Sequence, residues 1–202
     1  TLIDLRKDSA NIAIKGQSEL RDFGASLAIG DINNDGLDDL IIGDTGYDKP
    51  EKESGKDKPE KESGKLFVVY GSKSYVNHQI DLSKEDTDMT VNSPSWSYLG
   101  TSLASSDVNG DGIDDIIAGA TGGNYGGVYV FYGNNNYINK KIKLKMENSN
   151  IRIMSKSGES VTSSDVNQDG INDIVIGTSL GDSSNADDNV GSVYIIYGKK
   201  WI

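Results

Sequence analysis

The chain has 202 residues, enough to form one sizeable hydrophobic core or part of a larger one. Its 20 Lys and Arg residues stand against 31 Asp and Glu residues, and the resulting formal charge of −11 argues against nucleic acid and anionic membrane surfaces and favours cations. With no cysteine and one histidine, His78, the chain has no material for disulfides, thiolate metal sites or a Cys nucleophile, and almost none for a catalytic triad or a zinc site. No apolar run reaches the roughly 18 residues of a membrane span, so direct membrane insertion is not expected.

Taken in chain order, the predicted elements repeat three times. An inner pair of strands around an acidic loop comes first, then an apolar run ending in Tyr-Gly, then two shorter apolar stretches. The acidic units align without a gap and read FGASLAIGDINNDGLDDLIIG at 23–43, LGTSLASSDVNGDGIDDIIAG at 99–119 and SGESVTSSDVNQDGINDIVIG at 157–177. The Tyr-Gly runs are 64–71, 126–133 and 191–198, and the shorter stretches are 75–82, 89–91, 137–144 and 151–153.

These apolar runs are short, rich in Val, Ile, Tyr and Phe, and bounded by Gly or Asp, which indicates strands and not amphipathic helices. About four strands in each unit predict an all-β fold of propeller blades, each a sheet of four antiparallel strands. A β-sandwich is disfavoured by the equal repeats, and a β-solenoid by the length of the period.

The two ends of the chain are in phase with the repeat. Trp201-Ile202 falls where the other repeats have Tyr75-Val76 and Tyr137-Ile138, and the opening TLIDL matches HQIDL from residue 78. We therefore expect one propeller segment over 1–202, with blades at about 23–98, 99–156 and 157–202, the last taking its outer strands from 1–22. The chain opens with Thr1 and no signal peptide, as expected if an upstream segment has been removed.

Each acidic loop carries oxygen ligands at alternate positions, which is the chemistry of a hard cation such as Ca²⁺. Asp or Asn occupies positions 1, 3, 5 and 9, a glycine at position 6 lets the backbone wrap, and the carbonyl of position 7 can turn inward. The predicted metal ligands are Asp31, Asn33, Asp35, Leu37 and Asp39; Asp107, Asn109, Asp111, Ile113 and Asp115; and Asp165, Asn167, Asp169, Ile171 and Asp173. Position 8, which is Asp38, Asp114 or Asn172, is interpreted as solvated or as support beside the ligands.

An EF-hand is excluded, because position 12 is Ile42, Ala118 or Ile176 where that motif needs a bidentate Glu, and because the flanks are strands. The glycine-rich nonapeptides of a calcium-binding β-helix are absent. A plain polar turn remains the alternative, and three copies that keep every ligand position disfavour it. No general base or nucleophile accompanies the ions, so we expect three structural Ca²⁺ ions, no catalytic residue and no other cofactor. At about 10⁻⁴–10⁻³ M affinity, such sites fill outside cells.

The run FG-x-SLA-x-x-D-x-N-x-DG-x-x-DLIIG followed by G-x-VYV-x-YG resembles the FG-GAP repeat of integrin α-subunit propellers and of many bacterial surface proteins. The resemblance covers essentially the whole chain. The sequence departs from the family motif where Leu99-Gly100 and Ser157-Gly158 replace Phe-Gly. No repeat keeps the proline of the Gly-Ala-Pro part of the motif. The family propeller usually has seven blades, so the resemblance implies that the three blades here are part of a larger propeller. A ring closed by two chains and a closed three-bladed ring are the alternatives.

The resemblance also implies that the calcium loops lie on one face and that a protein or glycan ligand binds the opposite face, through loops of variable length. The longest of these loops contains the duplicated segment DKPEKESGK, at 48–56 and 57–65, which is interpreted as a tolerated duplication. Trp96, Tyr98 and Tyr125 fall near the same face.

The predicted function is a calcium-binding, secreted or cell-surface module for adhesion or protein interaction. The alternatives are the non-catalytic propeller of a secreted, phospholipase-type hydrolase and a carbohydrate-binding propeller.

Overall fold

The structure is a computed structural model that describes residues 11–16, 22–46, 64–74, 78–82, 87–94, 96–137, 140, 142–155, 160–178 and 191–200. The described part contains fourteen strands, three short 3-10 helices and no helix long and apolar enough to cross a membrane. The duplicated segment lies outside it, apart from Gly64 and Lys65. The strands are β1 (Ile12–Lys15), β2 (Phe23–Gly30), β3 (Asp39–Asp44), β4 (Lys65–Val69), β5 (His78–Asp81), β6 (Met89–Asn92), β7 (Ser102–Ser106), β8 (Asp115–Ala120), β9 (Gly127–Phe131), β10 (Ile142–Lys145), β11 (Ile151–Met154), β12 (Ser160–Ser164), β13 (Asp173–Thr178) and β14 (Ser192–Ile196), and the 3-10 helices are η1 (Gly123–Tyr125), η2 (Asn135–Tyr137) and η3 (Met146–Asn148).

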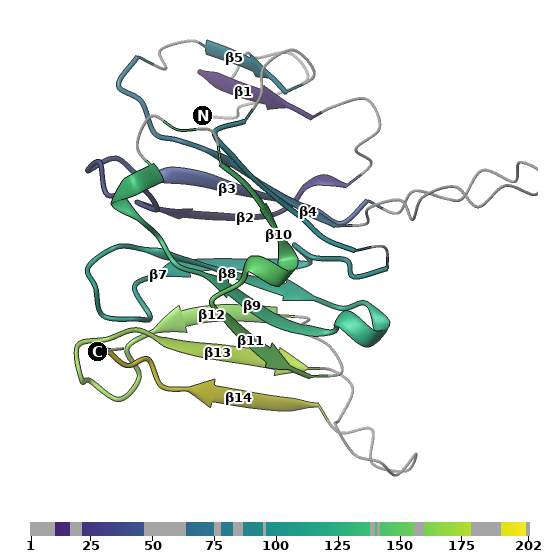
Figure 1. The fold of residues 1–202 in the computed structure, drawn as a ribbon, viewed down its shortest axis with the longest axis vertical. Coiled ribbons are helices and arrows are strands. Elements are labelled where there is room, and N and C mark those ends of the chain that lie inside the picture. Colours follow the sequence, from purple (N-terminus) through teal and green to yellow (C-terminus); the bar gives the residue numbers. More distant parts are fainter. Residues whose placement is uncertain are drawn as a thin grey trace, which may run out of the picture.

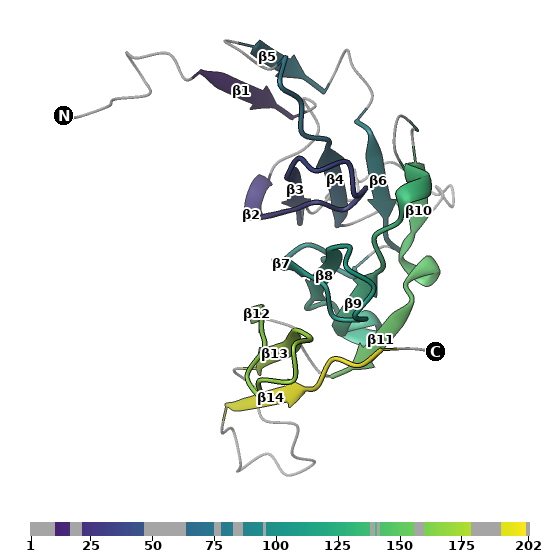
Figure 2. The same ribbon diagram turned by 90° about the vertical axis from the view of Figure 1, so that its left-hand side faces the viewer.

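Three antiparallel blades lie face to face and do not close into a ring (Figures 1 and 2). The strand order is β2-β3-β4-β6 in the first blade and β7-β8-β9-β11 in the second, so the predicted four-stranded blade is confirmed in both. The third blade has three described strands, in the order β12-β13-β14. The fold is therefore all-β and that of a partial propeller.

Two strands pair in a way that the sequence did not predict. β10, from the second repeat, adds to the outer edge of the first blade in parallel with β6, with Ile142 opposite Met89. β5, from the first repeat, pairs in the same parallel way with β1. β1 therefore takes, beside β5, the place that β6, the outer strand of the first blade, takes beside β10. In the described part of the chain, however, no inner strands of a blade pair with β1. In the described part of 1–22, β1 is paired with β5 and not with the third blade, while residues 1–10 and 17–21 lie outside the described residues. That residues 1–22 complete the third blade therefore stays a prediction.

The central strands of the first two blades are buried on both faces, because each of these blades is covered on both sides. In β4, Leu66 and Val68 belong to the cluster that faces the second blade, whereas Phe67 and Val69 belong to the cluster that contains Ile14 and Ile80. Alternate side chains of a strand point to opposite faces, so a continuous apolar run is needed where both faces are covered.

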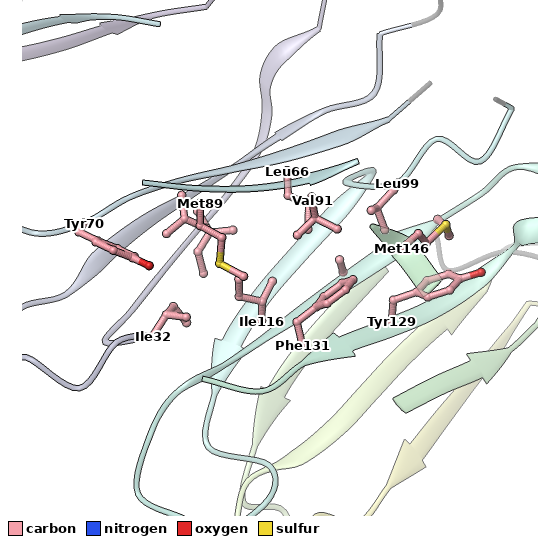
Figure 3. Packing of buried hydrophobic residues seen from close by; sticks show 14 residues of the cluster. Ile32, Leu66, Tyr70, Met89, Val91, Leu99, Ile116, Tyr129, Phe131 and Met146 are labelled. Carbon is pink, nitrogen blue, oxygen red and sulfur yellow. The ribbon is translucent and has the colours of Figure 1, made fainter. Parts of the chain in front are cut away.

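The largest core lies between the first and second blades, where Phe131, Ile116 and Met89 come together (Figure 3). A second core, built around Val130, Ile117 and Ile174, joins the second blade to the third. The acidic loops are thereby held at the ends of well-packed strands.

The glycine of the Phe-Gly pair has a backbone role. Gly24 has φ +86° at an irregularity in the β2–β3 register, and Gly100 has φ +92° at the matching point of the second repeat. Positive φ favours glycine, whereas Leu99 can replace the aromatic residue as a fully buried side chain.

Candidate metal centres

The three predicted metal loops join the first two strands of each blade. Residues 31–39 run from β2 into β3, residues 107–115 from β7 into β8, and residues 165–173 from β12 into β13. Figure 1 shows these connections along its left-hand side, whereas η1, between β8 and β9, lies on the right. All fifteen predicted ligand residues are described, and they lie in three separate loops, one on each blade.

The first carboxylate of each loop folds the loop back on itself. Asp31 Oδ1 accepts the N–H of Asp35 at 3.0 Å, and Asp31 Oδ2 accepts the N–H of Gly36 at 2.9 Å. The corresponding distances are 3.2 and 2.7 Å for Asp107, and 3.1 and 2.9 Å for Asp165. These bonds connect the carboxylate of position 1 to the backbone of positions 5 and 6, so that the loop curls back on itself.

Positions 3 and 5 continue the curl. Asn33 Oδ1 accepts the N–H of Asp35 at 2.8 Å, and Asp35 Oδ1 accepts the N–H of Leu37 at 2.9 Å. The same bonds are 2.9 Å long in the second and third loops. Three loops of different sequence thus adopt the same hydrogen-bonding pattern.

The curl requires two left-handed residues in each loop. Position 6 is Gly36, Gly112 or Gly170, with φ between +83° and +90° and no atom within 4 Å of an added Cβ, so glycine is favoured there by conformation and not by space. Position 4 is Asn34, Gly110 or Gln168, also at positive φ. The sequence did not identify position 4, although Asn and Gly are the residues that favour this region.

The aspartate at position 9 connects the loop to the residues that follow the third strand of the same blade, which is β4, β9 or β14. Asp39 Oδ2 accepts the N–H of Ile32 at 3.0 Å, and its Oδ1 accepts the N–H of Gly71 at 2.8 Å. Asp115 accepts from Val108 at 3.1 Å and from Gly133 at 3.0 Å. Asp173 accepts from Val166 and Gly198, both at 2.9 Å. The glycine of each Tyr-Gly pair is therefore a partner of the acidic loop, which sequence spacing alone does not reveal.

Burial raises the pKa of two of the position-9 carboxylates, Asp39 and Asp115. Asp39 and Asp115 are fully buried. Burial raises the pKa of Asp39 to about 6, opposed by the Gly71 and Ile32 N–H bonds and helped by the Asp35 and Asp31 charges. Burial likewise raises the pKa of Asp115 to about 7, with N–H bonds from Gly133 and Val108 opposing it and Asp111 and Asp107 adding to it. A nearby cation would favour the charged form of both groups.

The donor set fits a hard cation. Each loop offers three carboxylates, one Asn amide oxygen and the carbonyl of position 7, and an ionised carboxylate has about four lone-pair sites, so N–H bonds leave capacity for a metal. Among the described residues no three Asp, Glu, His or Cys side chains gather closely enough to hold a metal ion by themselves. The amide and carbonyl oxygens would therefore be needed to complete any site.

Position 8 differs between the blades. Asp38 is exposed, as the sequence suggests, whereas Asp114 is half-buried and its Oδ2 accepts the N–H of Asp31 at 3.0 Å. Asp114 thus supports the loop of the neighbouring blade. The spacing within one repeat gives no signal for this contact, because it joins residues 83 positions apart.

Strained aromatic residues lie away from the acidic loops. Trp96 and Tyr98 have φ values of +66° and +52°, and Trp96 is 55% exposed. The carbonyl of Ser97 accepts the N–H of Gly122 at 2.9 Å, and a Cβ at Gly122 would collide with the backbone of Trp96. Left-handed conformations of bulky residues cost free energy and often mark functional surfaces.

The model of the FG-GAP repeat matches residues 23–66, 99–131 and 157–196. The chain belongs to the FG-GAP repeat family. The resemblance seen in the motifs is thereby confirmed, and the three matches follow the order of the three stacked blades.

FG-GAP relatives include integrin α subunits and a phospholipase. The chain is 31% identical to mouse integrin alpha-7 over 138 residues, which are 65% of this chain and 10% of that protein. It is 32% identical to the Caenorhabditis elegans integrin alpha pat-2 over 166 residues, 76% of this chain and 13% of that protein. Rat phosphatidylinositol-glycan-specific phospholipase D is 28% identical over 166 residues, 76% of this chain and 18% of that protein. The chain therefore spans under a quarter of the length of these relatives.

Proposed function

We propose that this FG-GAP chain is a calcium-binding section of an extracellular β-propeller, secreted or at the cell surface, that mediates cell adhesion or protein–protein interaction. The similarity to integrin α subunits supports the adhesion role and the extracellular location. In this proposal the blades run over 23–98, 99–156 and 157–202, with outer strands of the last supplied by 1–22. Further blades, or a second chain, would complete the ring.

Three structural Ca²⁺ ions are proposed, one in each acidic loop. Side chains at positions 1, 3, 5 and 9 and the carbonyl of position 7 would hold each ion, and the ion would supply the positive charge that offsets three carboxylates. The observation that carries this proposal is the position-9 aspartate: Asp39 and Asp115 are fully buried, and neighbouring acids add to the raised pKa of each. A cation removes that unfavourable charge, so binding should stabilise the fold.

The test is the thermal unfolding of the whole chain in EDTA and with calcium restored. We expect calcium at about 1–10 mM to raise the melting temperature by several degrees, because ions of this class bind with about 10⁻⁴–10⁻³ M affinity. Magnesium serves as the control, since it demands a tighter octahedral shell. A melting temperature that is the same in EDTA and in calcium would overturn the metal proposal.

The interaction surface is proposed on the face opposite the acidic loops, for a protein or glycan ligand. The exposed Trp96, held in a strained backbone, supports it, since Trp offers a large apolar surface with a polar N–H. The same samples can be coated on a surface for cell attachment. Attachment that is lost in EDTA, and separately lost in Trp96→Ala with an unchanged melting temperature, would support the interaction role, and attachment equal to an uncoated surface would contradict it.

A second candidate function follows from the similarity to phosphatidylinositol-glycan-specific phospholipase D of rat and of Dictyostelium discoideum. The chain would then be the non-catalytic propeller region of a secreted hydrolase. In either case this chain contributes no catalytic residue. A hydrolase active site in a flanking domain of the full-length protein would favour this second candidate.

A further inference from the structure

Neighbouring acidic loops touch each other through the blade interface. At the first junction, Asp31 donates its N–H to Asp114 Oδ2 at 3.0 Å, and Asn134 donates its N–H to the carbonyl of Ile32 at 2.9 Å. At the second junction, Lys199 donates its N–H to the carbonyl of Val108 at 3.3 Å, as the equivalent of Asn134. The backbone contact is thus repeated, so each loop abuts the following blade.

The side-chain contact differs between the two junctions. Asp114 and Asn172 both hold position 8, but Asp114 is a potential negative charge and Asn172 is neutral. Asn172 donates its backbone N–H to the carbonyl of Asp107 at 3.2 Å. The loop 31–39 therefore has a neighbouring carboxyl group beside its first ligand, whereas the loop 107–115 meets the backbone of Asn172, a residue that carries no charge.

The small residue before each loop explains why the two junctions differ. A Cβ on Gly30 would lie 2.8 Å from Asp114 Oδ2 and would collide with Ser105. The second junction has Ser106 in the place of Gly30, and its hydroxyl is hydrogen-bonded to that of Ser163. Gly30 thus leaves the space that Asp114 uses, whereas the equivalent residue at the second junction, Ser106, has a side chain that contacts Ser163.

Asp114 also lies within the electrostatic field of the first loop. It is half-buried, its Oδ2 accepts the N–H of Asp31, and the carboxylates of Asp31, Asp38 and Asp107 are its acidic neighbours. These like charges repel when no cation is present. A divalent cation in the loop would attract all of them, and the attraction is stronger where water screens it less.

We propose that Asp114 is a positioning residue for the loop 31–39 of the neighbouring blade, and that this loop binds calcium more tightly than the loop 107–115, whose following blade carries neutral Asn172 at position 8. The inference rests on the proposed calcium binding. Asp114 holds the N–H of the first ligand and adds a carboxylate outside the ligand set. An extra negative charge of this kind should tighten binding about fivefold at low salt, and less at high ionic strength.

A site-resolved calcium titration of the full 202-residue chain tests the inference. The backbone amide signals of Gly36, Gly112 and Gly170 report the three loops separately by nuclear magnetic resonance. In the unmodified chain, Gly36 should reach its midpoint at about fivefold lower calcium than Gly112. In Asp114→Asn, which keeps an oxygen that can accept the Asp31 N–H, the Gly36 midpoint should rise about fivefold while that of Gly170 stays unchanged.

Asp38→Asn is the matched control. It removes the same charge from the same loop position in the first repeat, but Asp38 is exposed, so the Gly36 midpoint should move clearly less. The inference is overturned if Gly36 and Gly112 titrate together in the unmodified chain, or if Asp114→Asn moves Gly36 no more than Asp38→Asn does. If no loop signal moves up to about 10 mM calcium, the proposed calcium function itself fails.

Discussion

Strands β9 and β14 have nearly the same sequence but very different surroundings. GGVYVFYG in the second blade and GSVYIIYG in the third place equivalent residues in equivalent strands. Val128 is fully buried between blades, whereas its counterpart Val193 is 71% exposed, and Val130 and Ile195 differ in the same way, at 0% and 52%. The burial of this face of a blade therefore comes from the blade that follows it and not from its own residues, as expected for repeat structures.

The largest difference in unfolding free energy between the two blades is expected when the last residue of β9 or of β14 is truncated to alanine. Phe131→Ala should lower the free energy of unfolding by about 3–5 kcal/mol, because Phe131 is buried in the core between the first two blades. Ile196→Ala, at the equivalent position of β14, should cost clearly less, since Ile196 is 37% exposed. Urea unfolding of both variants measures this difference. Equal losses would mean that the third blade is covered in solution.

The position-9 aspartates should show an intermediate effect. Asp115→Ala leaves the N–H groups of Val108 and Gly133 without their acceptor in a buried place, which costs about 1–3 kcal/mol for each such group. Asp173→Ala should cost less, because its bonds to Val166 and Gly198 are only partly buried and water can replace them. Unfolding in EDTA separates this role from metal binding. A larger loss in Asp173→Ala would reverse the comparison.

The smallest effect comes from an isosteric change at the matched valines. Val128→Thr places a hydroxyl in the core and should destabilise the chain by about 1–3 kcal/mol, whereas Val193→Thr should stay within about 0.5 kcal/mol. The two variants have the same composition, so chemical denaturation compares surroundings alone. A destabilised Val193→Thr would show that the exposed face of β14 is in contact with something in solution.

Most of the local structure was accessible from the sequence. The three repeats, the short strands and the alternating Asp and Asn positions led to blades and acidic loops, and two four-stranded blades were confirmed. The reason is that strand patterns and turn residues such as Gly36 and Gly112 act over a few residues, so their signal is contained in the repeat itself. The metal ligands stay a prediction, although each of the three loops has the fold that the pattern requires.

The sequence by itself determined the unit: its strands, its curled loop and the residues offered to a cation. The tertiary structure decided what surrounds each copy: the burial of Val128 against the exposure of Val193, the parallel addition of β10 to β6, and the contact of Asp114 with Asp31. These features join different repeats. Equivalent residues can meet different neighbours, so the order in which the blades stack, and not the spacing within one repeat, sets their environment.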